Sequence, residues 1–342
     1  MMDFTSIISA VVAFLVTALL GYVLIPFLKK LKYGQTILDD GPNWHKDKQG
    51  TPTMGGIMII AGVIVSIAVA YGYSKLANLQ FSYQLSNSLY RVKMIAGIAF
   101  ALCMAAIGFA DDFIKVVKKR NLGLTARQKT FLQLIVSAGY LATLCIGGMD
   151  SINLPFFGDV NIISGWGLIF WPIALMFVYG FTNAVNLTDG IDGLASSVTL
   201  VVACCFMLAS GFVINAPVNA MASALAGACV GFICWNSKPA KVFMGDTGSM
   251  FLGGMVVALS FSIGRPVMLI FAGIVYLIEA LSDIIQDAFY KKTKKRVFKM
   301  APLHHHFEMC GWSEQKIVLV FSLITLVGSF IAISPLIFNF LL

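Results

Sequence analysis

The chain has 342 residues, of which 58% are hydrophobic and only 12% are charged, and its formal net charge is +8. A soluble domain is typically about 45–50% apolar and about 25% charged. The composition therefore excludes an ordinary soluble globular protein and indicates a polytopic membrane protein, forming one integral membrane domain over residues 1–342. The seven cysteines include no CxxC pair and lie mostly in apolar runs, which favours small buried side chains over disulfides or a zinc site.

Long apolar runs predict an all-α fold with about ten transmembrane helices. They cover residues 4–28, 54–73, 94–110, 131–147, 166–185, 194–212, 220–235, 250–263, 266–289 and 317–338. The connections between these helices differ sharply in charge, because the odd-numbered ones hold 20 of the 24 Lys and Arg residues. Basic loops stay in the cytoplasm. We therefore expect the odd-numbered connections to be cytoplasmic and both termini to lie outside.

The even-numbered connection at residues 151–165 carries no basic residue. Its apolar residues alternate on both sides of a Phe-Gly-Asp sequence, which predicts a short β-hairpin on the outer surface. This segment contains no side chains that suggest chemistry.

The first connection ends in Thr51-Pro52-Thr53, followed by two glycines at the start of the second helix. An exposed backbone at a helix start can bind an anion, and Lys48 would add a positive charge for a phosphate. A plain turn with a helix cap fits the same residues equally well.

The third connection opens with Asp111 and Asp112 directly after an apolar helix. Adjacent side chains on a helix point about 100° apart, so these two carboxylates are expected to have different roles. The basic residues that follow fit topology and contact with lipid headgroups. Lys129 is the exception, because it lies at the mouth of the fourth helix.

The fifth connection places Asn183, Asn186, Asp189 and Asp192 three residues apart, and a glycine follows each aspartate. On a helical turn each of these side chains would neighbour the next. Carboxylates at the mouth of a membrane helix are costly unless they bind something. Two interpretations remain: a polar loop with a helix cap, or a site for a cation or a polar ligand.

In the seventh connection, Asp246 follows a glycine at the start of the eighth predicted helix. A carboxylate and backbone N–H groups can meet a phosphate–metal unit at such a place. The ninth predicted helix carries Glu279, Asp283 and Asp287 on one face, which must face protein or water. A structural partner in the bundle and a catalytic role both remain open for this stripe.

The ninth connection contains His304, His305 and His306 in succession. Neighbouring side chains diverge, and no Cys or carboxylate stands at a zinc-ligand spacing, so a dedicated zinc site is disfavoured. Imidazoles that contact a diphosphate, or that act as acid or base, fit better.

Apart from the stripe on the ninth predicted helix, these polar motifs lie on the first, third, fifth, seventh and ninth connections, so the predicted topology gathers them at one membrane face. Carboxylates, lysines and Gly-rich helix starts suit magnesium and a diphosphate. Phosphoryl transfer needs mainly positioning and charge neutralisation. We therefore expect a transferase that moves a phosphoryl group from a soluble nucleotide donor to a lipid phosphate. A secondary transporter would usually place its carboxylates near the midplane of the membrane, often with inverted repeats, whereas here they are predicted at one face. A channel or scaffold would not need converging acidic loops.

The same motifs resemble the polyprenyl-phosphate N-acetylhexosamine-1-phosphate transferases over essentially the whole chain. They are residues 50–56 (GTPTMGG), 111–112 (DD), 186–193 (NLTDGIDG), 242–246 (VFMGD) and 302–308 (PLHHHFE). The first and last motifs resemble one bacterial branch, the phospho-N-acetylmuramoyl-pentapeptide transferases. The resemblance implies transfer of phospho-MurNAc-pentapeptide from UDP-MurNAc-pentapeptide to undecaprenyl phosphate, giving lipid I and UMP. A related GlcNAc-1-phosphate transferase is the alternative.

The resemblance also implies ten helices, Mg²⁺, a homodimer, no nucleic-acid partner, and an active site facing the cytoplasm in the bacterial inner membrane. It implies that Asp246 binds the metal together with Asp192, that Asp111 and Asp112 lie near the lipid phosphate with one of them as base, and that His304 is catalytic. The implied substrate-binding residues are Lys48, Lys129, Asn186, Asp189, Asp192, Asn236, Phe243, Gly245, His305 and His306.

Overall fold

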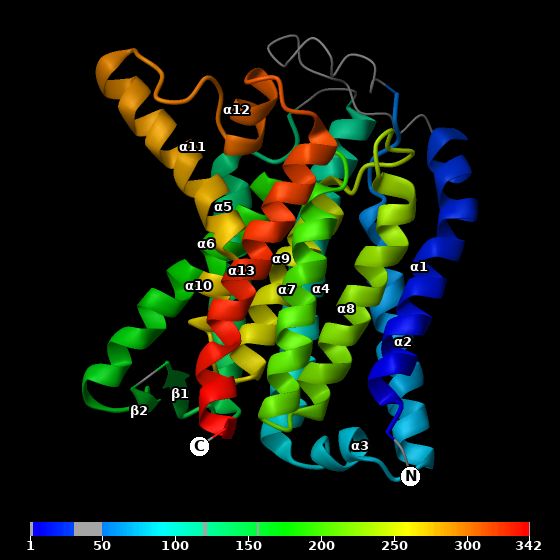
Figure 1. Cartoon of the computed structure of the whole chain (residues 1–342), viewed down its shortest axis with the longest axis vertical. Helices are drawn as coiled ribbons and strands as arrows, with labels where there is room; N and C mark the ends of the chain where they lie inside the picture. Colours follow the sequence, from blue (N-terminus) through cyan, green and yellow to red (C-terminus); the bar gives the residue numbers. More distant parts are fainter. Residues whose placement is uncertain (1–2, 31–49, 119–121, 156, 342) are drawn as a thin grey trace.

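Long helices form the bundle that the apolar runs predict (Figure 1). A computed structural model describes residues 3–30, 50–118, 122–155 and 157–341. The long helices are α1 (Thr5–Lys30), α2 (Gly56–Leu76), α4 (Ser88–Val117), α5 (Ala126–Ile146), α6 (Phe170–Thr188), α7 (Leu194–Phe212), α8 (Ala216–Asn236), α9 (Gly245–Ser262), α11 (Ile274–Thr293) and α13 (Glu314–Leu341). Short helices are α3 (Gln80–Gln84), η2 (Gly165–Ile169), α10 (Met268–Ala272) and α12 (Leu303–Met309).

Eight helices in the described part of the chain are long and apolar enough to cross a membrane. This number confirms the all-α, multi-pass class that the composition predicts. The two long helices outside this set are α9 and α11, which correspond to the eighth and ninth predicted spans. Helix α9 has 18 residues and lies almost entirely inside the bundle, whereas α11 carries the acidic stripe and ends in lysines.

The ninth predicted span, residues 266–289, is not the single helix that the apolar run suggests. Helix α10 ends at Ala272, and α11 begins at Ile274 and leans outward from the bundle in Figure 1. Gly273 lies between them with φ −98° and ψ 24°, outside helical values. A side chain at this position would meet the Leu269 carbonyl at 2.7 Å, so glycine allows the break. Hydropathy does not detect such a break, because the residues on both sides are apolar.

Helix α9 is the core of the bundle, and α4 packs along it. The two backbones approach closely because small residues line the contact, as is common between membrane helices. A Cβ at Gly254 would come within 2.6 Å of the Ala101 Cα, and one at Gly108 would come within 2.1 Å of the Asp246 carbonyl oxygen. This close approach brings the end of α4 against the beginning of α9.

The predicted hairpin is confirmed as β1 (Ser151–Leu154) and β2 (Gly158–Asn161), paired antiparallel from Ser151↔Asn161 to Leu154↔Gly158. It is anchored to the turn after α9, because the Asn153 N–H donates to the Gly264 carbonyl at 2.8 Å and Arg265 donates to the Asn153 side chain. The hairpin, α3, the beginning of α1 and the end of α13 lie at one end of the bundle (Figure 1). Helix α12 lies at the opposite end, together with the end of α4.

Candidate active site

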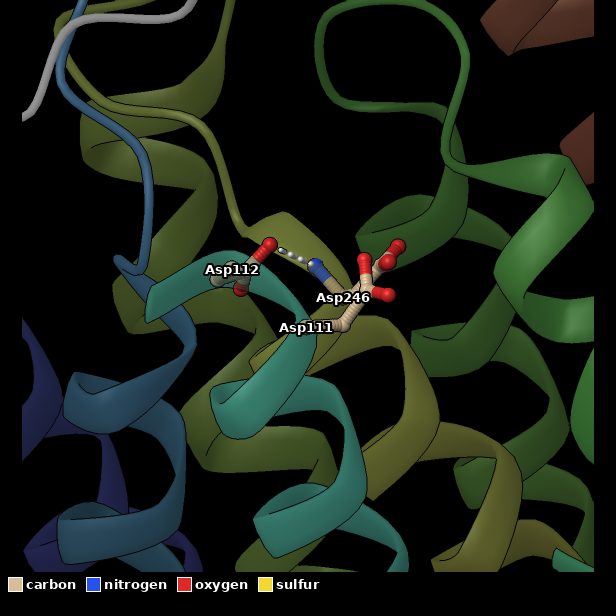
Figure 2. A group of neighbouring side chains, drawn as sticks. All are labelled: Asp111, Asp112 and Asp246. Carbon is tan, nitrogen blue, oxygen red and sulfur yellow. Dashed lines mark hydrogen bonds between the residues drawn. The ribbon is translucent and has the colours of Figure 1, made fainter. Parts of the chain in front are cut away.

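Three aspartates meet where α4 ends and α9 begins (Figure 2). Asp111 and Asp112 lie in the last two turns of α4, and Asp246 lies in the first turn of α9. Each offers a carboxylate oxygen, and these oxygens lie within 4.8 Å of one another. Like charges this close repel, so the group is stable only with cations nearby. We call Asp111, Asp112 and Asp246 the acidic triad.

Asp112 is buried and holds the beginning of α9. Its carboxylate accepts hydrogen bonds from the Asp246 N–H at 3.2 Å, the Thr247 N–H at 2.9 Å and the Thr247 hydroxyl at 2.7 Å. The first N–H groups of a helix have no partner within the helix, and a carboxylate is favoured there. Asp112 therefore acts as the missing cap of α9, supplied from another helix.

Asp111 faces other partners, as the helical geometry predicts for adjacent residues. One oxygen accepts from the Leu124 N–H at 2.8 Å, and the other pairs with the Lys115 ammonium at 2.6 Å. Lys115 stands one turn further along α4, a spacing at which opposite charges meet on a helix. Lys115 is not among the site residues predicted from the sequence, although its spacing from Asp111 is a usable signal.

Asp246 is the member of the triad that contacts both lysines and an asparagine. One oxygen lies 3.0 Å from both the Lys115 and the Lys129 ammonium groups, and the other accepts from the Asn186 amide at 2.9 Å. The predicted residues Lys129 and Asn186 are thus brought to Asp246. The two lysines offset part of the negative charge of the triad, and their long side chains could turn toward an arriving anion.

The fifth connection does not continue the helical spacing that its sequence suggests. Helix α6 ends at Thr188, and Gly193 adopts φ 80° before α7 begins, so Asp189 and Asp192 lie in a turn. Asn183 faces α5, where its side chain exchanges hydrogen bonds with the Gln133 side chain. Of the four evenly spaced residues, only Asn186 forms a hydrogen bond with the triad within the described part of the chain.

Asp189 lies at the beginning of this turn; the residue is partly exposed, but its carboxyl is enclosed by protein atoms. Burial of the carboxyl, followed by the charges of Asp246, Asp112 and Asp192, raises its pKa to about 8. The pKa rises because a carboxylate that is enclosed next to other carboxylates favours its neutral form when no metal ion balances their charge. Asp189 therefore belongs to the electrostatic field of the triad.

Asp192 is buried and lies in a separate network. Its carboxylate accepts from the Ala240 N–H at 3.1 Å, and its own N–H donates to Glu314 at 3.3 Å. The next N–H, of Gly193, donates to the Asn236 side chain at 3.0 Å. These bonds join the fifth connection, the seventh connection and the beginning of α13. A metal-binding role for Asp192 remains a prediction, because the triad gathers without it.

The three histidines diverge, as their adjacency predicts. His304 is buried, and its Nδ1 lies 2.6 Å from Glu279 Oε2. His305 pairs with Glu308 at 2.7 Å on the same short helix, whereas His306 Nδ1 accepts from the Lys299 N–H at 3.1 Å.

Comparison with known proteins decides the family. The family model for Glycosyl transferase family 4 matches residues 94–264, and the phospho-N-acetylmuramoyl-pentapeptide-transferase signature 1 matches residues 48–60. Curated proteins named phospho-N-acetylmuramoyl-pentapeptide-transferase match along nearly their full length. The protein from Clostridioides difficile (strain 630) is 44% identical, covering 95% of this chain and 96% of its own. The protein from Clostridium perfringens (strain SM101 / Type A) is 44% identical, covering 98% of each.

The chain belongs to the phospho-N-acetylmuramoyl-pentapeptide-transferase family. A third member, from Listeria monocytogenes serotype 4b (strain CLIP80459), is 40% identical over 96% of this chain and 97% of its own. The family resemblance drawn from the sequence motifs is therefore confirmed. The region matched by the broader family model runs from α4 to the end of α9, and so contains the whole acidic triad.

The signature of this transferase family lies beside the seventh connection. The Phe243 N–H donates to the Pro52 carbonyl at 2.8 Å, and the Gly55 N–H donates to the Phe243 carbonyl at 2.9 Å. Gly245 follows with φ 72°, and a Cβ there would come within 2.6 Å of an Asp112 oxygen. Gly245 is thus held against the triad, and the partly exposed Phe243 lies two residues before it in the chain. Lys48, predicted as a phosphate contact, lies outside the described residues.

Proposed function

We propose that this protein transfers phospho-MurNAc-pentapeptide from UDP-MurNAc-pentapeptide to undecaprenyl phosphate, releasing UMP and forming lipid I. Family membership supports the reaction class. The observation that carries the proposal is the acidic triad with Lys115 and Lys129, placed at the end of apolar helices. A site there is within reach of a water-soluble nucleotide and of a lipid phosphate.

The triad fits a divalent cation. Magnesium typically takes one or two protein carboxylates and completes its octahedron with water and phosphate oxygens. Asp246 and Asp111 are the members whose side-chain oxygens face lysines, whereas Asp112 is held by the N–H groups at the start of α9. We propose that Asp246 is the main ligand, with Asp192 as a second candidate. Bound Mg²⁺ would neutralise the diphosphate and reverse the negative sign of the site.

In the proposed reaction, an oxygen of the lipid phosphate bonds to the phosphorus that carries the sugar. The bond from that phosphorus to the UMP phosphate breaks, and UMP leaves with the electron pair. Lys115 and Lys129 would leave Asp246 and hold phosphate oxygens as negative charge moves toward UMP. Asn186 would keep Asp246 oriented, because its amide also donates to the Ser249 hydroxyl at 2.8 Å.

The reaction is tested by following radiolabel from UDP-MurNAc-pentapeptide into an organic-soluble lipid. We expect labelled lipid to form in the presence of undecaprenyl phosphate and Mg²⁺, with equimolar release of UMP. UDP-GlcNAc serves as the competing donor. A comparable kcat/KM with UDP-GlcNAc would contradict the muramoyl assignment, and transport of label without lipid formation would support a secondary transporter.

We further propose that the triad faces the cytoplasm of a bacterial inner membrane and that both termini lie outside. The charge bias supports this orientation, as does the position of the hairpin and of the end of α13 at the end of the bundle away from α12 (Figure 1). A cysteine beside Asp159 should react with an impermeant reagent added outside cells, and one beside Lys118 should not. The exposed native Cys103, Cys145, Cys234 and Cys310 must first be replaced.

We also propose that the protein forms a homodimer, as the family resemblance implies. Native mass spectrometry of the detergent-solubilised protein would report the number of chains in each particle. A single chain per particle at activity-supporting concentrations would contradict this part of the proposal.

A further inference from the structure

The Glu279–His304 pair is buried and shares no residue with the triad. The two side chains are 0% and 1% exposed. One Glu279 oxygen accepts from His304 Nδ1 at 2.6 Å, and the other accepts from the His304 backbone N–H at 3.1 Å. A carboxylate only accepts, so Nδ1 carries the proton in this pair. Both the orientation and the tautomer of the ring are therefore set by Glu279.

The other edge of the ring faces the turn that carries Asp189 and Asp192. A Cβ at Gly190 would lie 2.1 Å from His304 Nε2 and 2.7 Å from Cε1. The ring edge therefore packs directly against the Gly190 backbone. Nε2 itself is buried and has no hydrogen-bond partner among the residues that the structure describes. The position of the His304 ring is thus determined by Glu279 on one side and by the Gly190 backbone on the other.

The position of Glu279 depends on the break at Gly273. Because α11 restarts at Ile274 and leans outward, Glu279 comes to lie beside the first residues of α12. The other members of the acidic stripe have different surroundings. Asp287 is exposed and pairs with Lys291 one turn away at 2.6 Å. Only Glu279 among these three side chains has a hydrogen bond to the histidine motif within the described part of the chain.

We propose that Glu279 is a positioning residue of the active site. Through His304 it supports the turn at Gly190, and this support fixes the path of the chain from Asn186, whose amide donates to Asp246, to the predicted site residues Asp189 and Asp192. Gly190 is required because any side chain there would displace the ring. The inference rests on the proposed function, because that function defines what the turn faces: the metal ion and the diphosphate of the donor.

The test uses Glu279→Gln and Gly190→Ala in the full-length protein. A glutamine can accept only one of the two hydrogen bonds from His304, and an alanine methyl group would collide with Nε2. Each has a matched control. Asp287→Asn removes an exposed carboxylate from the same helix, and Gly180→Ala adds a methyl group on α6, where a Cβ would have no atom within 4 Å.

Two quantities are measured: kcat as a function of Mg²⁺ concentration, and the rise in Tm that Mg²⁺ produces without substrate. We expect both test variants to fold, to lose at least about 10-fold in kcat, and to need at least about 5-fold more Mg²⁺ for half-maximal stabilisation. The two controls should stay within about twofold of the wild type. A merely structural role would lower Tm but leave the response to Mg²⁺ unchanged, and that result would overturn the proposal.

The double variant tests whether both residues act through His304. Effects that share one path are not additive, so Glu279→Gln with Gly190→Ala should be no more than about twofold worse than the worse single variant. Independent, multiplying effects would contradict the shared path. If Glu279→Gln does not fold, Gly190→Ala alone decides, because it leaves Glu279 intact. Absence of lipid transfer by the wild type would instead contradict the proposed function, while the Mg²⁺-induced Tm shift would still test this inference.

Discussion

Asp246 and Asp192 are both predicted to bind metal, yet the fold surrounds them differently. Asp246 faces two lysine ammonium groups at 3.0 Å and an amide. Asp192 accepts from a backbone N–H, and its own backbone is held by Glu314. Lysine side chains can turn away when a metal ion or a phosphate arrives, whereas a backbone N–H cannot leave without moving the chain. Among the contacts that the structure describes, those of the Asp246 carboxylate are exchangeable and those of Asp192 hold the backbone.

The largest expected effect is that of Asp246→Asn. We expect the variant to fold but to lose about 10²–10⁴-fold in transfer rate, because a charge interaction worth about 3–5 kcal/mol in the transition state is removed. Turnover is measured against Mg²⁺ concentration. Near-normal turnover at low Mg²⁺ would show that Asp246 is not the main ligand.

Asp111→Asn should also be severe, at roughly 10²–10³-fold in rate, because this carboxylate holds Lys115 and, in the proposed reaction, would face the reacting phosphates. Unlike Asp246→Asn, it should retain most of the Mg²⁺-induced rise in Tm. Loss of that rise would mean that Asp111 binds the metal as strongly as Asp246. Asp159→Asn, on the distant hairpin, serves as the control.

Asp192→Asn is expected to have a smaller effect, about 10-fold in rate, because an asparagine oxygen can still accept from the Ala240 N–H. This result decides whether Asp192 differs from Asp246 in its role. If Asp192→Asn were as damaging as Asp246→Asn and abolished the response to Mg²⁺, both residues would be metal ligands, as the family resemblance implies.

The smallest expected effect concerns Asp189 and pH. Its pKa is raised to about 8 in the folded protein, above the ordinary value of 3.8, so it destabilises the metal-free fold as pH rises from about 4 toward 8. Asp189→Asn should therefore raise the Tm of the metal-free protein at pH 8 by about 2–4 °C. The difference should shrink toward pH 4 and level off above pH 8. The Tm values are measured with a chelator present. A Tm difference between the variant and the wild type that did not change with pH would contradict the raised pKa of Asp189.

Much of the architecture could be predicted from the sequence. Apolar runs locate the helices because burial in lipid is a property of each segment, and the odd-numbered connections gather the polar motifs by alternation alone. The hairpin was predicted from alternating residues and is present at the expected segment. The motifs 50–56 and 302–308 indicated the transferase branch that the curated relatives confirm. Each of these predictions depends on local pattern, and the ninth apolar run, which the fold breaks at Gly273, is the exception.

Only the tertiary structure decided which polar side chains meet. The contact at Gly108 joins the end of α4 to the beginning of α9 and so assembles the triad. In the last turns of α6, Asn186 contacts Asp246, while Asn183 one turn earlier faces α5. The break at Gly273 brings Glu279 to His304. The physical reason is common to all of these: a side chain's direction at a helix end depends on how helices distant in sequence pack, and no local pattern encodes that packing.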